Sequence, residues 1–318
     1  MNIKAIQVLE EVKKAVKGKD ECVEEALAAI LAGGHILIED VPGVGKTTLA
    51  LALSKSMALK NHRTQFTPDV LPADLIGFSM YQKGTGNFVY MPGAVMCNLY
   101  LADEINRTSP KTQSALLEVM EEGNVTVDGE EHPVPSPFIV VATQNPKGSA
   151  GTQPLPESQL DRFMVCMSMG YPSFEDEIAI AKGKSEGELL DGVRPVITAQ
   201  ELRHFQEEVK EVYIDDSLYK YMNQLVRATR ENQYIDLGVS PRGTVALTKM
   251  VKATAYLKGR SFVIPEDVVQ VFVDVARHRI VLNTKARAAH VREAQVLTKI
   301  LEETQKPVAR KERRGYRD

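Results

Sequence analysis

The chain has 318 residues, of which 43% are hydrophobic and 25% charged, and its net charge at pH 7 is −3. These values are typical of a soluble globular protein that is long enough for two domains, each with a sizeable core. The longest apolar stretch, residues 26–38, is interrupted by Gly33, Gly34 and His35 and is too short to cross a bilayer. No signal peptide opens the chain, so we expect a cytoplasmic protein without a membrane span.

The cysteines and histidines indicate which kinds of stabilising or metal site this protein lacks, and the charges indicate a distinct C-terminal segment. Three cysteines, an odd number, stand without metal-ligand spacing, and the six histidines are scattered, which predicts neither a disulfide framework nor a transition-metal site.

Residues 306–318 carry six Lys or Arg against Glu312 and Asp318, a local charge of +4 that leaves −7 for the rest of the chain. Such a tail could contact nucleic acid or a membrane surface, but it is also typical of a frayed terminus, and we expect it to be flexible.

Over the first 170 or so residues, helical patterns alternate with short apolar runs. The runs cover residues 36–38, 99–102 and 138–142. Alternation of this kind predicts a parallel sheet covered by helices. Two hairpin-like segments interrupt it, residues 81–93 and residues 124–135, and in the second Asp128-Gly129 has the chemistry of a tight hairpin turn.

After residue 173 the pattern becomes helical throughout. Thr198 and Glu201 form a capping box, and apolar residues follow at helical spacing as far as Val212. Similar stripes cover residues 217–229, 240–257 and 265–280. The sequence therefore predicts an α/β domain over residues 1–172, an all-α domain over residues 173–305 and the basic tail over residues 306–318.

The stretch after the first predicted strand indicates a phosphate-binding loop. Gly43 and Gly45 allow the backbone to turn its N–H groups towards an anion, and a helix that begins near Lys46 adds its positive end. Lys46 would reach the β- and γ-phosphates, and the Thr47 hydroxyl would bind Mg²⁺. Asp40 stands where the full signature has its first glycine, so for this motif alone an ordinary turn with a solvated lysine stays an alternative.

Two carboxylates follow the second predicted strand. Asp103 and Glu104 would lie at the carboxyl edge of a parallel sheet, where ligands bind in open α/β folds. Asp103 can hold the Mg²⁺ shell, and Glu104 can orient and polarise a water that attacks the γ-phosphate. An acidic pair that caps a helix is the alternative for either residue singly. Coupled to Lys46, the two carboxylates predict ATP hydrolysis.

Three further polar residues are candidates. Asn145 ends the third predicted strand, where it could position the same water or hydrogen-bond the following turn. Arg162 stands beside Asp161, and taken alone the two residues indicate a surface ion pair. Ser240 fits a helix N-cap, so Arg242 lies in the first turn, where a cation opposes the helix dipole. An anionic phosphate would give that arginine a favourable partner.

In this order, the motifs resemble those of an AAA+ ATPase, and several phrases are similar to the MoxR family in particular. These phrases are LADEINR with PKTQSALLEVMEE, VTVDGEEHPVPSPFIVVATQNP, GTQPLPESQLDRF and PEDVVQVFVDVARHRI. The resemblance implies a P-loop AAA+ core, with a helix-2 insert and a pre-sensor-1 hairpin, followed by an all-α lid. It places ATP on Gly43, Val44, Gly45, Lys46, Thr47 and Thr48.

The resemblance also assigns family roles to single residues. The matches are Walker A Lys46 and Thr47, Walker B Asp103 and Glu104, sensor-1 Asn145, sensor-2 Arg242 and arginine-finger Arg162. In the family an arginine finger acts on ATP held by a neighbouring subunit. The resemblance therefore implies a ring, typically a hexamer. It also implies that Asp103 reaches Mg²⁺ through water.

We therefore expect an ATP-hydrolysing ring that remodels or matures client proteins, with partners that carry von Willebrand factor A domains, as the resemblance implies. A nucleic-acid motor is one alternative, but only the basic tail supports it, and we do not expect nucleic acid as the partner. A metal-chelatase motor subunit of the same branch is another. A scaffold that binds ATP without turnover is the last, and it would have little need of Glu104.

Overall fold

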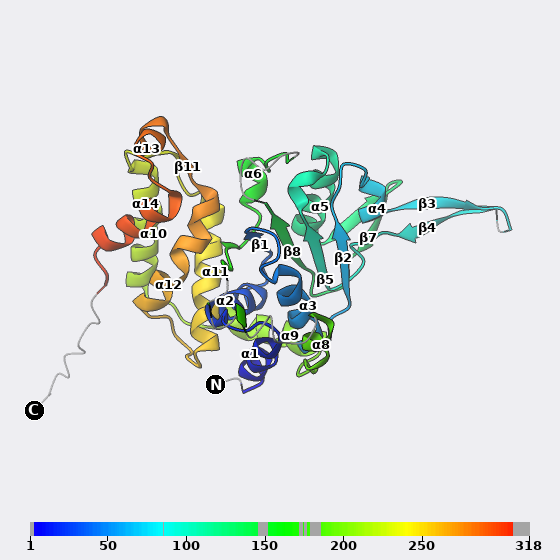
Figure 1. Ribbon diagram of the computed structural model, residues 1–318, viewed down its shortest axis with the longest axis horizontal. Helices are drawn as coiled ribbons and strands as arrows, with labels where there is room; N and C mark the ends of the chain where they lie inside the picture. The colour runs from blue at the N-terminus through cyan, green and yellow to red at the C-terminus, as the bar shows by residue number, and fades with distance from the viewer. Residues whose placement is uncertain are drawn as a thin grey trace, which may run out of the picture.

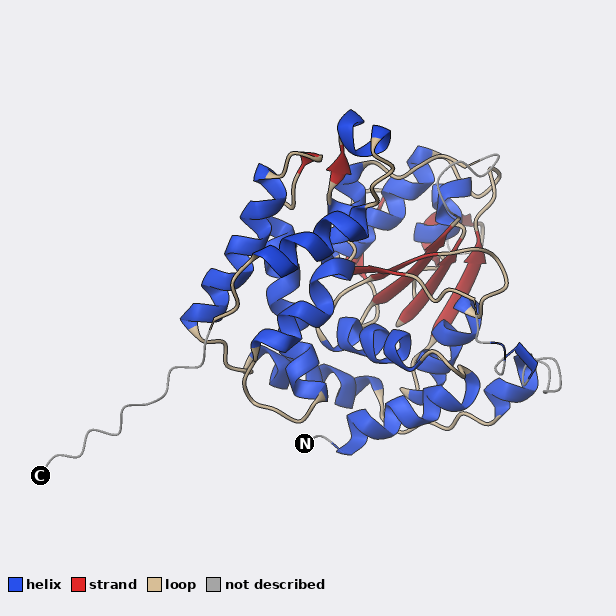
Figure 2. Ribbon diagram, turned by 60° about the vertical axis from the view of Figure 1, so that its left-hand side comes forward, coloured by secondary structure: helices blue, strands red, loops and turns tan. Residues whose placement is uncertain are grey.

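The computed structural model describes residues 3–84, 86–145, 152–171, 174, 177–178 and 186–307. A five-stranded parallel sheet lies in the N-terminal part, with helices around it (Figure 1; Figure 2). In spatial order its strands are β2 (Asn61–Gln65), β5 (Leu99–Asp103), β8 (Ile139–Gln144), β1 (Ile36–Glu39) and β9 (Val165–Met167). The predicted parallel sheet is confirmed, and the three apolar runs are its three inner strands.

Side chains of the inner strands alternate between two hydrophobic cores, one on each face of the sheet. Ile36 and Ile38 of β1 enter the first core, whereas Leu37, between them, enters the second. The first core includes residues of α1 (Ile3–Ala15), α2 (Asp20–Leu31) and α3 (Lys46–Ser56), and the second includes residues of α5 (Pro110–Glu122). Because both faces are buried, these strands are continuous apolar runs rather than alternating ones.

The apolar runs do not predict the two edge strands. β2 has the polar sequence NHRTQ and is exposed along most of its length, and β9 has only three residues. A strand at the edge of a sheet is paired on one side only, so it needs fewer apolar side chains than an inner strand. Its backbone pairing with β5 places β2 in the sheet.

Both predicted hairpins are present. β3 (Gly77–Gln82) pairs with β4 (Asn87–Pro92), so the first hairpin begins four residues before the predicted start at residue 81, and it projects from the sheet as a long arm (Figure 1). A short helix, α4 (Pro72–Ile76), precedes it. β6 (Asn124–Val127) pairs with β7 (Glu130–Pro133) in the second hairpin. Asp128 and Gly129 at its turn have φ of 52° and 85°, the two positive values that a type I′ turn requires.

The C-terminal part is mostly helical. Its helices are α8 (Glu186–Asp191), α9 (Ala199–Lys210), α10 (Asp216–Glu231), α11 (Pro241–Leu257), α12 (Pro265–Ala276), α13 (Thr284–Ala288) and α14 (Glu293–Glu303). The predicted capping box is confirmed, since the Glu201 N–H donates to the Thr198 hydroxyl and the Thr198 N–H donates to the Glu201 carboxylate. The expected tail falls outside the described residues from residue 308 onward.

The predicted helical character of this part is confirmed, but its described residues also include one ribbon of short strands that the sequence does not predict. β10 (Ile235–Leu237) and β11 (Val281–Leu282) form an antiparallel ribbon between helices that are distant in sequence. Strands of three and two residues are too short to show an alternating pattern, and long-range pairing alone determines them.

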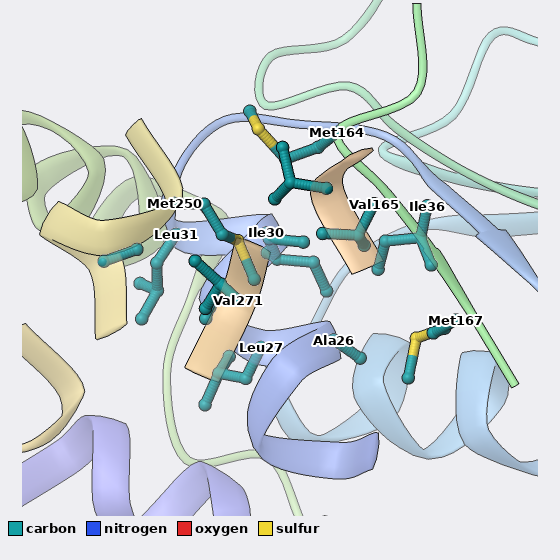
Figure 3. Packing of buried hydrophobic residues seen from close by; sticks show 14 of the residues in the cluster. Ala26, Leu27, Ile30, Leu31, Ile36, Met164, Val165, Met167, Met250 and Val271 are labelled. Atoms are coloured by element: carbon teal, nitrogen blue, oxygen red, sulfur yellow. The ribbon is translucent and has the colours of Figure 1, made fainter. Parts of the chain in front are cut away.

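The first hydrophobic core continues from the sheet into the helical part. Figure 3 shows Leu27 and Ile30 of α2 packed together with Val165 of the sheet and with Met250 and Val271 from helices α11 and α12. Helix α2 therefore contributes to both parts, and the sheet and the lid share one core.

A buried ion pair also joins the two parts, and it lies beside Arg162. Arg279, in the short helix η2 (Arg277–Arg279), is 5% exposed and donates from Nε to Asp161 Oδ1 at 2.7 Å. Its terminal nitrogens donate to backbone carbonyls of the sheet part. Asp161 Oδ2 accepts a hydrogen bond from the hydroxyl of Ser240, the N-cap of α11, at 2.7 Å. Asp161 thus pairs with Arg279 and not with its neighbour Arg162.

We expect Arg279→Met to lower the free energy of unfolding by roughly 3–5 kcal/mol, the cost of removing one partner of a buried ion pair. Methionine keeps much of the apolar volume but leaves the Asp161 carboxylate and several carbonyls without their donor. The matched control is Arg227→Met, because Arg227 pairs with Glu231 on an exposed surface, and there we expect a change below about 0.5 kcal/mol. Chemical denaturation followed by circular dichroism measures both changes. Equal losses of unfolding free energy in the two variants would contradict a special stabilising role for the ion pair of Arg279 with Asp161.

Candidate active site

The predicted phosphate loop lies at the carboxyl end of β1. Gly43 and Gly45 have φ of 84° and 92°, in the left-handed region that favours glycine. Helix α3 begins directly after Gly45, and no described side chain caps it. Its first N–H groups can therefore bind an anion at the positive end of the helix. Val44 packs against the first core, Thr47 is half-buried and Thr48 is buried.

Asp40, the departure from the loop signature, has a structural role that a glycine could not fill. Its carboxylate accepts hydrogen bonds from the Val41 N–H at 2.8 Å, the Ser168 hydroxyl at 2.9 Å and the Gly170 N–H at 2.6 Å. Burial raises the pKa of Asp40, but these hydrogen bonds outweigh burial and hold the pKa below its usual value. The backbone here does not have the positive φ of the two loop glycines. Asp40 fixes the start of the loop to the segment after β9.

Lys46 is buried among acidic groups at this edge of the sheet. It is 8% exposed, and its Nζ donates to the backbone carbonyl of Asp40 at 2.7 Å. Burial lowers the pKa of Lys46, and the negative charges of Asp40, Asp103 and Glu104 oppose that effect. The structure thus brings the lysine and the acidic pair together, as the sequence predicts.

Asp103 is held on both carboxylate oxygens. The Thr143 hydroxyl, on β8, donates to Asp103 Oδ1 at 2.6 Å, and the Arg63 guanidinium, on β2, donates to Oδ2 at 2.8 Å. The same Thr143 oxygen accepts a hydrogen bond from the Glu104 N–H at 2.8 Å. One hydroxyl therefore fixes both members of the acidic pair. Sequence reasoning misses Thr143 and Arg63, since only the sheet pairing places them beside Asp103. The one available signal is the hydroxyl of Thr143 near the end of an apolar strand, which indicates a polar role at that edge of the sheet.

Glu104 has an unusual backbone conformation, with φ of 57°. A left-handed conformation at a residue other than glycine is strained, and such residues cluster at functional sites. The Glu104 carboxylate accepts hydrogen bonds from Asn145 Nδ2 at 3.3 Å and from Arg107 at 2.8 Å. Asn145 is thus next to Glu104, where it could help to position a water. Arg107 forms an ion pair with the Glu104 of its own chain.

The structure places Arg162 and Arg242 together but away from this group. Both line a hollow of about 200 Å³ with Gly33, Gly34 and His35, which precede β1, whereas the phosphate loop follows β1. The length of β1, roughly 13 Å for four residues at 3.3 Å each, separates the two ends. Both guanidinium groups pair with the carboxylate of Glu121. The sequence predicts a phosphate as the partner of Arg242, whereas within the chain its partner is the Glu121 carboxylate, which sequence reasoning misses.

The donor set near Lys46 fits a magnesium ion. The Thr47 hydroxyl and the Asp103 carboxylate would supply hard oxygen atoms of the kind that Mg²⁺ prefers, directly or through water. Thr47 opens α3 at the loop, and Asp103 ends β5 at the same edge of the sheet.

Comparisons with known proteins agree with this geometry. The family model described as "ATPase family associated with various cellular activities (AAA)" matches residues 35–165, and the AAA lid domain model matches residues 227–300. The chain is 38% identical to Chaperone MoxR1 of Mycobacterium tuberculosis, over 92% of this chain and 79% of that protein. The chain belongs to the MoxR family of AAA+ ATPases.

Other relatives of this MoxR-family chain match along almost all of its length. The uncharacterized protein YeaC of Bacillus subtilis is 45% identical over 96% of this chain and 95% of its own. A crystal structure described as a "putative ATPase" from Cytophaga hutchinsonii is 39% identical and superposes with a TM-score of 0.88, covering 96% of this chain and 95% of that one. The predicted family and the AAA core with its lid are thus confirmed, and membership makes the chain an ATPase that binds ATP. Within the described residues, no helix is long and apolar enough to span a membrane.

We expect Thr143→Val to lower turnover at least about tenfold, because it removes the hydroxyl that holds Asp103 and the Glu104 N–H, and small misplacements of catalytic groups cost that much or more. Nucleotide affinity should change little, since Thr143 does not belong to the phosphate loop. Thr143→Ser is the matched control, and it should keep most activity because it retains the hydroxyl. Steady-state turnover and equilibrium binding of a fluorescent nucleotide measure the two effects, and equal turnover in both variants would rule out the role of the hydroxyl.

Proposed function

We propose that this chain hydrolyses ATP to ADP and phosphate in a ring, typically a hexamer, in which each site is completed by a neighbouring copy. One observation supports this most directly. Lys46, Asp103 and Glu104 lie at the carboxyl edge of the sheet, whereas Arg162 and Arg242 lie at the amino edge of the same sheet. A chain that carries both halves of a phosphoryl-transfer site at opposite edges can join them only by contact with a second copy.

In this proposal, each polar group has a separate task. The N–H groups of the loop and Lys46 hold the β- and γ-phosphates. Glu104 orients and polarises the attacking water, with Asn145 beside it. Arg162 and Arg242 of the neighbouring copy stabilise the charge that develops on the transferred phosphoryl group.

Thr47 and Asp103 would hold Mg²⁺, and the ion, when bound, neutralises charge on the β- and γ-phosphate oxygens. In the described structure Asp103 pairs with Arg63, so this arginine competes for the carboxylate that Mg²⁺ would use. Asp103 itself is buried, but the Arg63 side chain is 47% exposed, so its guanidinium can exchange the carboxylate for water.

We further propose that hydrolysis serves the remodelling or maturation of client proteins, with partners that carry von Willebrand factor A domains. The name of the relative Chaperone MoxR1 supports a chaperone role. The projecting hairpin supports a contact with other proteins, because Phe78, Met80 and Phe88 are all exposed on it. The domain bounds that go with this function are residues 1–172 for the nucleotide-binding core and residues 173–305 for the lid.

Two substitutions separate binding from chemistry. We expect Lys46→Ala to abolish nucleotide binding, because it removes the cation among the loop groups. We expect Glu104→Gln to keep binding and to lose turnover by about a hundredfold or more, because an amide cannot polarise the water as a carboxylate does. Fluorescent-nucleotide binding and phosphate release measure the two steps. Full turnover in Glu104→Gln would contradict the assigned role.

Mixed assemblies test the contribution of a neighbour. Arg162→Ala and Glu104→Gln chains should each be inactive alone, since one lacks the arginine and the other the carboxylate. Mixed together they should regain a fraction of wild-type turnover, because the intact site of one faces the intact arginine of the other. Light scattering and labelled chains verify that the two co-assemble. Co-assembly without any recovery would contradict the action of Arg162 on a neighbouring site.

A further inference from the structure

Glu121 lies between the two arginines that the proposed function assigns to the neighbouring site. Its Oε2 is 2.9 Å from the guanidinium of Arg162, and its Oε1 accepts a hydrogen bond from Arg242. The three residues come from three separate elements: Glu121 near the end of α5, Arg162 after the short helix α6 (Glu157–Leu160), and Arg242 in the first turn of α11. One carboxylate thus connects an arginine of the core with an arginine of the lid.

The hollow that Glu121 shares with the two arginines carries more positive than negative charge. This hollow is also lined by Lys249, and by Asp161 and Arg279, whose charges cancel in their own ion pair. Glu121 can neutralise only one of the two guanidinium groups. An excess of positive charge therefore remains in this hollow, although Glu118 and Glu122 line the adjoining hollow on the other side of Arg162.

The surrounding contacts fix where the two guanidinium groups lie. Arg162 also donates to the backbone carbonyl of Leu117, one turn earlier on α5, and its buried Nε has no hydrogen-bond partner among the described residues. The N-cap of α11, Ser240, is bonded to Asp161, the residue before Arg162. A side-chain hydrogen bond thus joins the two segments that carry the arginines, and Glu121 sets the directions of the arginine side chains.

We propose that Glu121 is a positioning residue that holds Arg162 and Arg242 as one paired unit for the nucleotide phosphates of a neighbouring copy. This inference rests on the proposed function. Two guanidinium groups at one place repel each other, and each long side chain has many rotamers, so without a shared carboxylate they would spread apart. With it, both are ordered before the neighbour arrives, and less conformational entropy is lost when they bind phosphate.

The exposure of the three side chains allows the unit to open. Glu121, Arg162 and Arg242 have side chains that are 35%, 28% and 47% exposed. Ion pairs with this much solvent contact are weak and exchange readily. A phosphate group, which carries more negative charge than a carboxylate and accepts bidentate arginine contacts, can take over the guanidinium groups or share them with Glu121.

The mixed assembly described above gives a direct test. We add Glu121→Gln either to the Glu104→Gln chain, which supplies the arginines, or to the Arg162→Ala chain, which supplies the site. On the arginine-supplying chain it should lower the recovered turnover by about tenfold to a hundredfold, as misplaced catalytic groups do. On the site-supplying chain it should have no effect. Glu211→Gln on the arginine-supplying chain is the matched control, since Glu211 is an exposed carboxylate at the end of α9 that lines no hollow with the two arginines, and we expect no effect there.

Each outcome has one meaning. Loss from the arginine-supplying chain alone supports the positioning role, as does partial recovery with Glu121→Asp, which keeps the charge. In the intact homogeneous assembly, Glu121→Gln should lower kcat and leave KM for ATP within about twofold, because the loop that binds ATP is untouched. Loss from both chains, or from neither, overturns the inference while the proposed function stands. If the parent mixture itself never recovers although the chains co-assemble, the proposed function fails, and the inference fails with it.

Discussion

The ion pair of Arg279 with Asp161 is the contact on which the arrangement of this protein depends. Apolar packing along α2 joins the sheet to the lid, but hydrophobic contact is not directional and leaves the exact angle of a helix loosely defined. The hydrogen bonds of Asp161 to Arg279 and to Ser240 are directional, and they fix the first turn of α11 against the amino edge of the sheet. The position of Arg242 relative to Arg162 follows from this contact.

The direction of the strands imposes a second constraint. In a parallel sheet all carboxyl ends meet at one edge, which here collects Lys46, Asp103 and Glu104, and all amino ends meet at the other, near the two arginines. The groups to which the proposed function assigns phosphate binding and water activation therefore cannot meet the arginines within one chain. Under the proposed function, assembly is a requirement of the chemistry, because the site is incomplete until two copies are in contact.

Carboxylates hold arginines in place at both edges of the sheet. Asp103 pairs with Arg63 and Glu104 with Arg107 at the carboxyl edge, and Glu121 pairs with two arginines at the amino edge. The arginine of each pair is partly exposed, so it can exchange its carboxylate for a phosphate or leave the carboxylate to a metal ion. Asp40 and Asp161 differ from them, because their hydrogen bonds connect separate segments of the backbone and of the core. The pairs of Asp103, Glu104 and Glu121 can thus exchange partners, whereas the hydrogen bonds of Asp40 and Asp161 hold the surrounding structure in place.

The sequence by itself determined the inner strands, the amphipathic helices, both hairpins, the capping box and the residues of the carboxyl edge. These features depend on local periodicity and on the order of residues along the chain, and both can be read without knowledge of contacts. Only the tertiary structure decided the polar edge strand β2, the ribbon of β10 and β11, the role of Asp40, and the partners Thr143, Arg63 and Glu121. Each of these depends on groups that are distant in sequence, and their pairing energy appears only after the sheet and lid have packed. The location of Arg162 and Arg242 at the opposite edge from Lys46 was decided in the same way, because the sequence gives the order of the motifs but not the edge at which each one lies.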